Sequence, residues 1–173
     1  MRPISALPGA IGTCALLCAA APLALPLGAV PITLQSLIVV LAGALAGGAG
    51  VAGVIAWLAL AALGLPVLAG IKGGIGAMSG FSAGFLIALP LASRLAMRWA
   101  PGWRWRPTLL LMLAGHGLLL VLGGAVIAMR GGDLAALAVL LPGALVKSVA
   151  AMAVLWVVGR RINVSARSTE MHR

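Results

Sequence analysis

Lys147 is the residue whose setting in the sequence points most directly to chemistry. It lies inside an apolar stretch over residues 134–158, and the two acids of the chain, Asp133 and Glu170, lie outside that stretch. A buried ammonium group needs a compensating charge or hydrogen-bond partner. The sequence leaves three interpretations open: an ion pair with Asp133, a bound anionic ligand, and a lysine that extends to the membrane surface without binding anything.

Pro142 and Gly143 interrupt the apolar stretch around Lys147. Proline suits the first turn of a helix and disrupts the middle of one. We therefore predict a short packed segment over residues 134–141 and a separate helix over residues 142–160. Lys147 would then lie about one turn into that helix, where the partial positive charge and unpaired N–H groups of a helix N-terminus favour an anion.

Two other segments carry groups that could contact a ligand. Thr33, Gln35 and Ser36 open an apolar helix, and the Gln amide has the donor and acceptor that an amide or urea group requires. Taken alone, the residue is better explained by a hydrogen bond between helices. The glycine-rich residues 70–76 allow close approach of backbone to a ligand, or form a flexible loop. They lack the GxxxxGK[ST] pattern of a P-loop.

The sequence offers little for catalysis. His116 lies between two glycines with no carboxylate nearby in the sequence, which favours a hydrogen-bonded packing role, and Cys14 and Cys18 are expected to be small core residues. The apolar stretches contain no carboxylate pair, no HExxH and no Ser–His–Asp set. We predict that the chain is not an enzyme and holds no cofactor or metal.

The composition identifies the solvent in which these residues lie. Apolar residues make up 63% of the 173-residue chain, charged residues make up 8%, and the mean hydropathy is +1.20. A soluble domain carries roughly 25% charged residues, so that class is excluded, and the hydrophobicity excludes disorder. The net charge of +10 alone would fit a nucleic-acid-binding protein, but the hydropathy does not. We expect a lipid bilayer as partner and no nucleic acid.

The apolar stretches are long and unbroken, which indicates helices rather than the alternating strands of a membrane barrel. We predict an all-α integral membrane protein, with a single transmembrane domain over residues 1–173. Its six predicted spans cover residues 4–25, 33–46, 51–65, 80–99, 108–129 and 142–160.

The distribution of Lys and Arg predicts the orientation, because these residues concentrate on the cytoplasmic side. With both termini in the cytoplasm, only Lys72 and Arg130 fall outside, and nine cations fall inside: Arg2, Arg94, Arg98, Arg104, Arg106, Arg160, Arg161, Arg167 and Arg173. Tryptophans flank the basic inner loop over residues 98–107, as interfacial anchors do. The same loop is alternatively a docking surface for a soluble partner.

Three segments, taken in order, resemble one family of membrane proteins. VPITLQSL at residues 30–37 resembles the VPITLQTL signature of BioY proteins, the biotin-specific substrate-binding (S) components of energy-coupling factor (ECF) transporters. GLPVLAG at residues 64–70, followed by GGIG at residues 73–76, resembles the family's GLPVFAGxxGGxG loop. LPGALVK at residues 141–147 resembles its PGDLxK segment.

The resemblance implies an ECF S-component bundle of six helices in the cell membrane, with both termini cytoplasmic. Such a protein would capture biotin at its outer face and deliver it with an ECF coupling protein and ATPases. Lys147 would face the biotin carboxylate, and Gln35 would lie near the ligand. The remaining expected ligand-binding residues are Thr33, Gly73, Gly74, Gly76, Ser82 and Phe85.

The sequence also departs from the family pattern. Ala144 stands where PGDLxK has Asp, and Lys72 stands where a small residue is common. The GPTGGY that usually follows the glycine loop is here GFSAGF at residues 80–85. These differences leave room for altered affinity or an altered ligand.

Two other function classes remain open. The first is a stand-alone facilitator or secondary transporter of a small carboxylate-bearing vitamin. The absence of an acid from the predicted spans counts against proton coupling but not against facilitated diffusion. The second is an assembly subunit that binds no ligand. Because the sequence has no Walker motif, active uptake would require partner ATPases.

Overall fold

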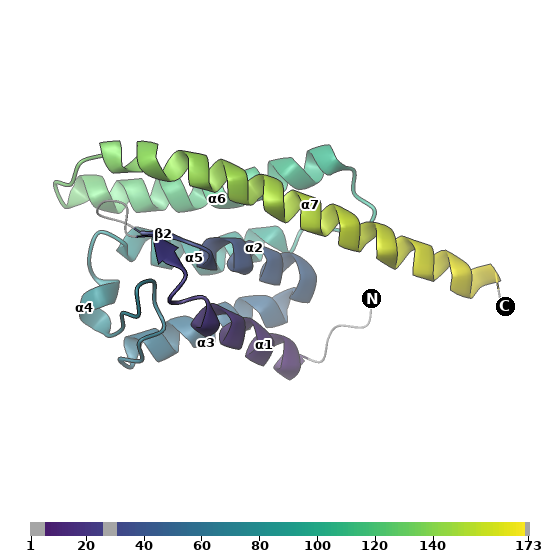
Figure 1. The fold of residues 1–173 in the computed structure, drawn as a ribbon, viewed down its shortest axis with the longest axis horizontal. Coiled ribbons are helices and arrows are strands. Elements are labelled where there is room, and N and C mark those ends of the chain that lie inside the picture. Colours follow the sequence, from purple (N-terminus) through teal and green to yellow (C-terminus); the bar gives the residue numbers. More distant parts are fainter. Residues whose placement is uncertain (1–5, 26–30, 172–173) are drawn as a thin grey trace.

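The computed structural model describes residues 6–25 and 31–171, which form seven helices and two short strands (Figure 1). In chain order the elements are α1 (Ala6–Ala19), β1 (Ala24–Leu25), β2 (Ile32–Thr33), α2 (Gln35–Ala46), α3 (Gly48–Ala62), α4 (Ile75–Met78), α5 (Ala83–Ala96), α6 (Trp105–Met129) and α7 (Ala135–Met171).

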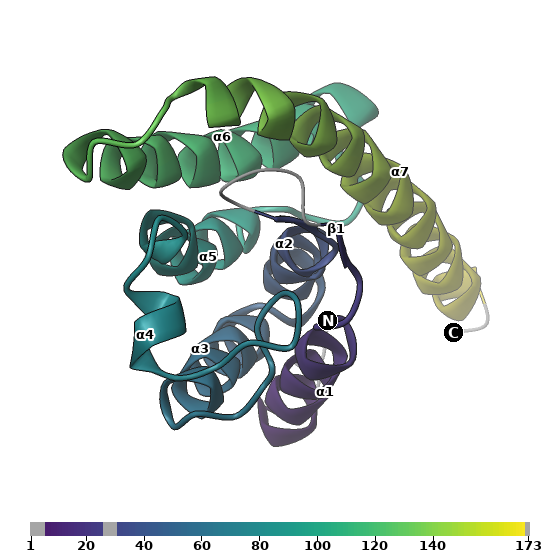
Figure 2. The same ribbon diagram turned by 60° about the vertical axis from the view of Figure 1, so that its left-hand side comes forward.

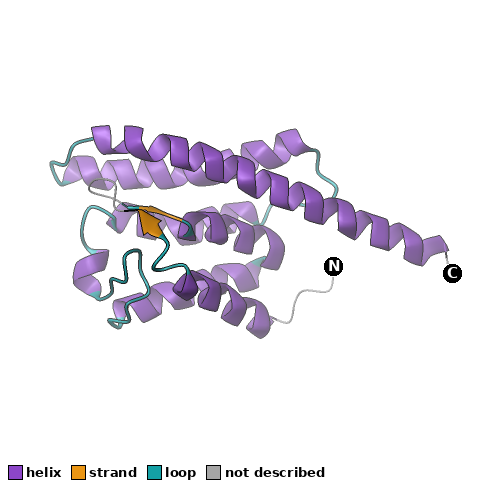
Figure 3. Ribbon diagram, in the orientation of Figure 1, coloured by secondary structure: helices purple, strands orange, loops and turns teal. Residues whose placement is uncertain are grey.

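The six longer helices pack in three layers of two. α6 pairs with α7, α2 lies beside α5 in the middle layer, and α1 pairs with α3 on the other side (Figures 1 and 2). The strands β1 and β2 pair antiparallel, with Ala24 opposite Thr33, and lie at the end of the bundle where α4 also lies (Figure 3). The beginning of α1 and the end of α7 both lie toward the opposite end (Figure 1).

Glycines allow neighbouring helices to approach closely, both within the middle layer and between that layer and α6. A Cβ atom at Gly43 of α2 would overlap the backbone oxygen of Ser93 on α5. A Cβ atom at Gly84 of α5 would overlap the backbone oxygen of Leu122 on α6. Small residues are the usual means by which membrane helices bring their backbones together. The middle layer is therefore packed backbone against backbone on both sides of α5.

The predicted helix break at Pro142 is wrong. α7 runs without interruption from Ala135 through Pro142, so residues 134–141 are not a separate segment. A proline removes one N–H from the helix, and in a membrane this single loss is tolerated when neighbouring groups or a small local adjustment compensate for it. Pro142 is also exposed, so its ring does not disturb the packing against α6.

The six longer helices lie where the sequence predicts spans, but α1, α2 and α5 are shorter than predicted, and α3 has the predicted length with both ends shifted toward the N-terminus. α1, α2, α3 and α5 contain 14, 12, 15 and 14 residues, whereas a helix needs about 20 residues to cross a bilayer alone. Among the described residues, α6 and α7 are long and apolar enough for that. Residues 20–25 and 33–34, at the ends of the first two predicted spans, lie in β1, β2 and the turns beside them, and residues 80–82 and 97–99 lie in turns on either side of α5.

Gln35 joins three parts of the fold through its side-chain amide. Its Nε2 donates to the backbone oxygen of Leu17 at 3.2 Å and to that of Val67 at 3.0 Å. The Val67 oxygen also accepts from the indole Nε1 of Trp57 at 2.9 Å. Gln35 and Trp57 are both buried. These bonds connect the end of α1, the start of α2 and the loop after α3.

We expect Gln35→Met to destabilise the protein in the absence of any added ligand. The substitution leaves the Leu17 carbonyl without its amide partner in an apolar interior, which costs about 1–3 kcal/mol. Thermal unfolding of the purified protein in detergent should show a lower midpoint. Ser82→Ala is the control, because the Ser82 hydroxyl reaches the oxygen of Ala77 only at 3.5 Å. Equal midpoints for parent and Gln35→Met would contradict this structural role.

Candidate functional site

A cavity of about 350 Å³ lies at the end of the bundle where β2 and α4 are found. Segments from across the chain form its wall: β2 and the start of α2, the loop after α3, α4, α5, α6 and α7. Its lining is largely apolar and includes Pro31, Ile32, Leu68, Leu86, Leu89, Leu119, Leu120 and Leu140. An apolar cleft with a few placed polar groups is the usual form of a small-molecule site.

Lys147 is the half-buried cation in this wall. Its Nζ donates to the backbone oxygen of Thr33 at 2.8 Å and to Oγ of Ser36 at 2.8 Å. An ammonium group has three protons to donate, so these bonds leave one for another acceptor. The two bonds also fix the ammonium against β2 and the first turn of α2.

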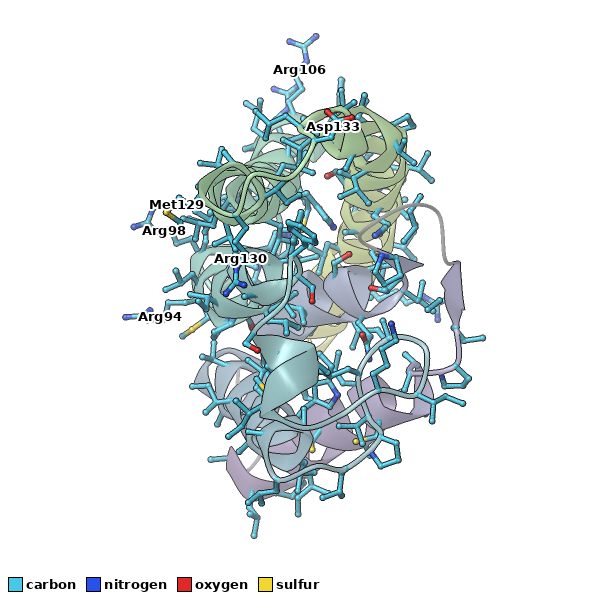
Figure 4. All side chains as sticks on the ribbon, turned by 90° about the vertical axis from the view of Figure 1, so that its left-hand side faces the viewer. Arg94, Arg98, Arg106, Met129, Arg130 and Asp133 are labelled. Atoms are coloured by element: carbon cyan, nitrogen blue, oxygen red, sulfur yellow. The ribbon has the colours of Figure 1, made fainter. Side chains whose placement is uncertain are left out.

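The ion pair between Lys147 and Asp133, one of the three interpretations that the sequence leaves open, is not formed. The two residues are 14 positions apart, or about 21 Å along a continuous helix, and α7 is not folded back at Pro142. Asp133 is exposed where α6 meets α7, and its Oδ1 accepts a hydrogen bond from the backbone N of Ala135 at 2.8 Å (Figure 4). Within residues 6–24 and 31–162, whose side chains are described, no carboxylate lies in the cavity wall.

The helix N-terminus beside Lys147 is not the one the sequence predicts. Lys147 lies 12 residues after Ala135, deep inside α7 rather than one turn from its start. Its ammonium instead lies at the start of α2, beside Ser36, where the first N–H groups have no partner within the helix. A helix N-terminus carries partial positive charge. Two positive features therefore meet at one point of the cavity, an arrangement that favours an anion.

Of the other predicted residues, five line the cavity: Gln35, Thr33, Gly76, Ser82 and Phe85. Gln35 has only its side-chain oxygen left for a ligand, because Nε2 serves Leu17 and Val67. The ring of Phe85 packs over Gly123 of α6, where a Cβ atom would overlap it. That contact holds the ring in place as an apolar part of the wall.

Gly73 and Gly74 do not belong to the cavity wall. A Cβ atom at Gly73 would overlap the backbone oxygen of Leu65. Gly74 has a φ of 85°, which favours glycine, and its N–H donates to the backbone oxygen of Ala61 at 2.7 Å. These two glycines fold the loop tightly back onto the end of α3, and the N–H of Gly74 is already used within the protein.

Several residues of the wall were noted in the sequence but not predicted as ligand-binding residues. Ser36 binds the Lys147 ammonium, and Lys72 and Ala144 also line the cavity. His116, assigned to packing, does make such contacts: its Nδ1 lies 3.1 Å from the backbone oxygen of Met112 and 2.9 Å from Oγ of Ser148. It belongs to the cavity wall as well. The sequence shows that His116 lies between two glycines, but it does not indicate the contact with Ser148 of α7.

Comparisons with known proteins agree with this architecture. A model of the BioY family matches residues 4–164. A biotin transporter of Rhodobacter capsulatus is 58% identical over 72 residues, which cover 40% of this chain and 38% of that protein. A biotin transporter of Lactococcus lactis is 33% identical over 113 residues, covering 63% of this chain and 62% of the relative. The chain thus spans less than two thirds of the length of either relative.

Structural similarity extends over almost the whole chain. The crystal structure of the S-component for biotin from an ECF-type ABC transporter superposes with a TM-score of 0.81 at 26% sequence identity. The match covers 91% of this chain and 92% of that one. Together with the family match, it identifies this all-helical, multi-pass membrane protein as a member of the BioY family.

Proposed function

We propose that this chain is a biotin-binding S component, which captures biotin in the cavity at one end of its helical bundle. The observation that carries the proposal is the Lys147 ammonium, held in the cavity wall at the start of α2 with one proton that has no acceptor among the described residues. Family membership and the likeness to the S-component for biotin support it. In this proposal the whole of residues 1–173 acts as one transmembrane substrate-binding domain.

The cavity suits the two chemically different parts of biotin. Its apolar lining, with Phe85 and several leucines, would pack against the fused rings and the aliphatic chain. The carboxylate would accept the free proton of the Lys147 ammonium in a charge-assisted hydrogen bond. Thr33 and Ser36 orient that ammonium through the two bonds already described.

The remaining predicted residues have supporting roles in this proposal. Gln35, Gly76 and Ser82 line the cavity and would contact the ligand from the side of α2 and α4. Gly73 and Gly74 would affect biotin binding indirectly, because they fix the conformation of the loop after α3.

We expect Lys147→Gln to bind biotin roughly 30-fold more weakly or worse, because removing one member of a buried charge pair costs 2–5 kcal/mol. Biotinamide, which lacks the negative charge, tests the cause. It should bind the parent protein weakly, and Lys147→Gln should distinguish biotin from biotinamide much less than the parent does. Isothermal titration or retention of radiolabelled biotin by the purified protein provides the affinities.

Lys72→Gln is the matched control, because Lys72 is the other cation in the wall but is exposed. It should change the affinity much less than Lys147→Gln does. If Lys147→Gln bound biotin as tightly as the parent, the carboxylate pairing would be wrong. If the parent retained no biotin at micromolar concentration, the proposed function would be wrong.

In the proposed orientation the cavity opens to the outside of the cell and both termini lie in the cytoplasm. Arg94, Arg98 and Arg106 project away from the bundle (Figure 4), and they come from the end of α5 and the start of α6, opposite to the end that holds the cavity. Trp105 stacks with Arg106 at 5.3 Å in the same region. Basic residues with tryptophans are typical of the cytoplasmic interface.

Thiol labelling tests this orientation. In a chain in which Cys14 and Cys18 are replaced by alanine, Met129→Cys should react with a membrane-impermeant maleimide added to intact cells. Trp103→Cys should react only after the membrane is permeabilised. Both parent side chains are exposed, so accessibility to water alone does not separate them. The reverse labelling pattern would show that the cavity faces the cytoplasm.

We further propose that uptake requires an ECF coupling protein and ATPases, because this sequence has no Walker motif of its own. In cells that lack these partners, and every other biotin transporter, the chain should bind biotin at the surface but not accumulate it above the external concentration. Co-expression of the partners should restore accumulation. Concentrative uptake by the chain alone would favour the stand-alone transporter instead.

A further inference from the structure

His116 is a buried polar residue of the cavity wall that the proposed function does not use. It is 2% exposed, and its Nε2 has no hydrogen-bond partner among the described residues. A buried polar atom without a partner is rare and costs about 1–3 kcal/mol. His116, which carries this unpartnered atom, also lines the cavity.

The surroundings of Nδ1 determine where the ring proton lies. The backbone oxygen of Met112, at 3.1 Å, can only accept a hydrogen bond. Ser148 Oγ has one proton, which its 2.8 Å contact directs to the backbone oxygen of Ala144, so it accepts from the imidazole at 2.9 Å. Two acceptors thus face Nδ1. In the neutral ring that burial favours, Nδ1 carries the proton and Nε2 is an acceptor.

The acceptor of His116 and the ammonium of Lys147 come from different walls of the cavity. The imidazole is fixed between α6 and α7 by Met112 and Ser148. The ammonium is fixed against β2 and α2 by Thr33 and Ser36. A ligand with an anionic end and an N–H end could therefore use both groups at once. Nε2 itself is shielded from water in the ligand-free protein, so a ligand N–H would reach it only after neighbouring side chains of the wall shift.

We infer that Nε2 of His116 accepts a hydrogen bond from an N–H of the ureido group of biotin, and so selects for a ligand that carries this donor. Ser148 is a positioning residue, which holds the ring through Nδ1 without touching the ligand. This inference rests on the proposed function, because it assigns the contact for the ureido end of the same ligand. It adds a specificity-determining residue to a site in which Lys147 is assigned to the carboxylate.

Two biotin analogues, each methylated on one ureido nitrogen, provide the test. The parent protein should bind one of them at least about 10-fold more weakly than biotin, as expected when a buried polar group loses its partner. His116→Leu should bind biotin about 10-fold more weakly than the parent, and should no longer distinguish biotin from that analogue. Biotinamide should still bind more weakly than biotin in His116→Leu, because the Lys147 contact is unchanged.

A second measurement does not depend on the folding of a variant. With His172 replaced by glutamine, His116 is the one remaining histidine, and ¹⁵N NMR of the labelled ring identifies the protonated nitrogen. We expect the proton on Nδ1 in the ligand-free protein and a shift of the Nε2 signal on saturation with biotin. An unchanged Nε2 signal, or an equal penalty for the methylated analogues in parent and His116→Leu, overturns this inference alone. A parent protein that binds no biotin overturns the proposed function and the inference together.

Discussion

The arrangement of the cavity depends on how the protein stabilises one ammonium group inside an apolar bundle. Lys147 Nζ bonds to Thr33 and Ser36, which lie 114 and 111 residues earlier in the chain. A lysine in a membrane span costs about 2.5–3.5 kcal/mol on insertion scales, and these two bonds supply the protein's part of the compensation. They also tie the middle of α7 to β2 and the start of α2, and so bring the walls of the cavity together.

The rest of the fold supports that point of contact. Glycines let the backbones of α2, α5 and α6 lie close together, while Gln35 and Trp57 hold the loop after α3 by sharing the Val67 oxygen. Hydrogen bonds and close packing of helix backbones together thus fix the walls of the cavity. In an apolar solvent, where burial of hydrophobic surface gives little gain between helices, such close contacts and polar bonds are the main sources of specific structure.

Most of the helical architecture could be predicted from the sequence, because long apolar stretches indicate helices that lie in a lipid bilayer. Lys147, Gln35, Thr33, Gly76, Ser82 and Phe85 could be placed in the wall through the family motifs. The sequence could not show whether a helix ends at Pro142. The free energy lost with the missing N–H bond is tolerated within the packed bundle, so the helix continues. The contact of His116 with Ser148 joins two helices across 32 residues, and no spacing rule encodes it. Gly73 and Gly74 belong to a family motif, but in this structure they form a tight loop and do not line the cavity.

The most direct measurement is an experimental structure of this protein with biotin bound. We predict biotin in the cavity between β2, α5, α6 and α7, with a carboxylate oxygen about 2.7–2.9 Å from Nζ of Lys147 and with the bonds of that ammonium to Thr33 and Ser36 retained. A structure with biotin bound elsewhere, or with its carboxylate away from Lys147, would contradict the central claim that this lysine of α7, whose ammonium lies at the start of α2, selects an anionic ligand.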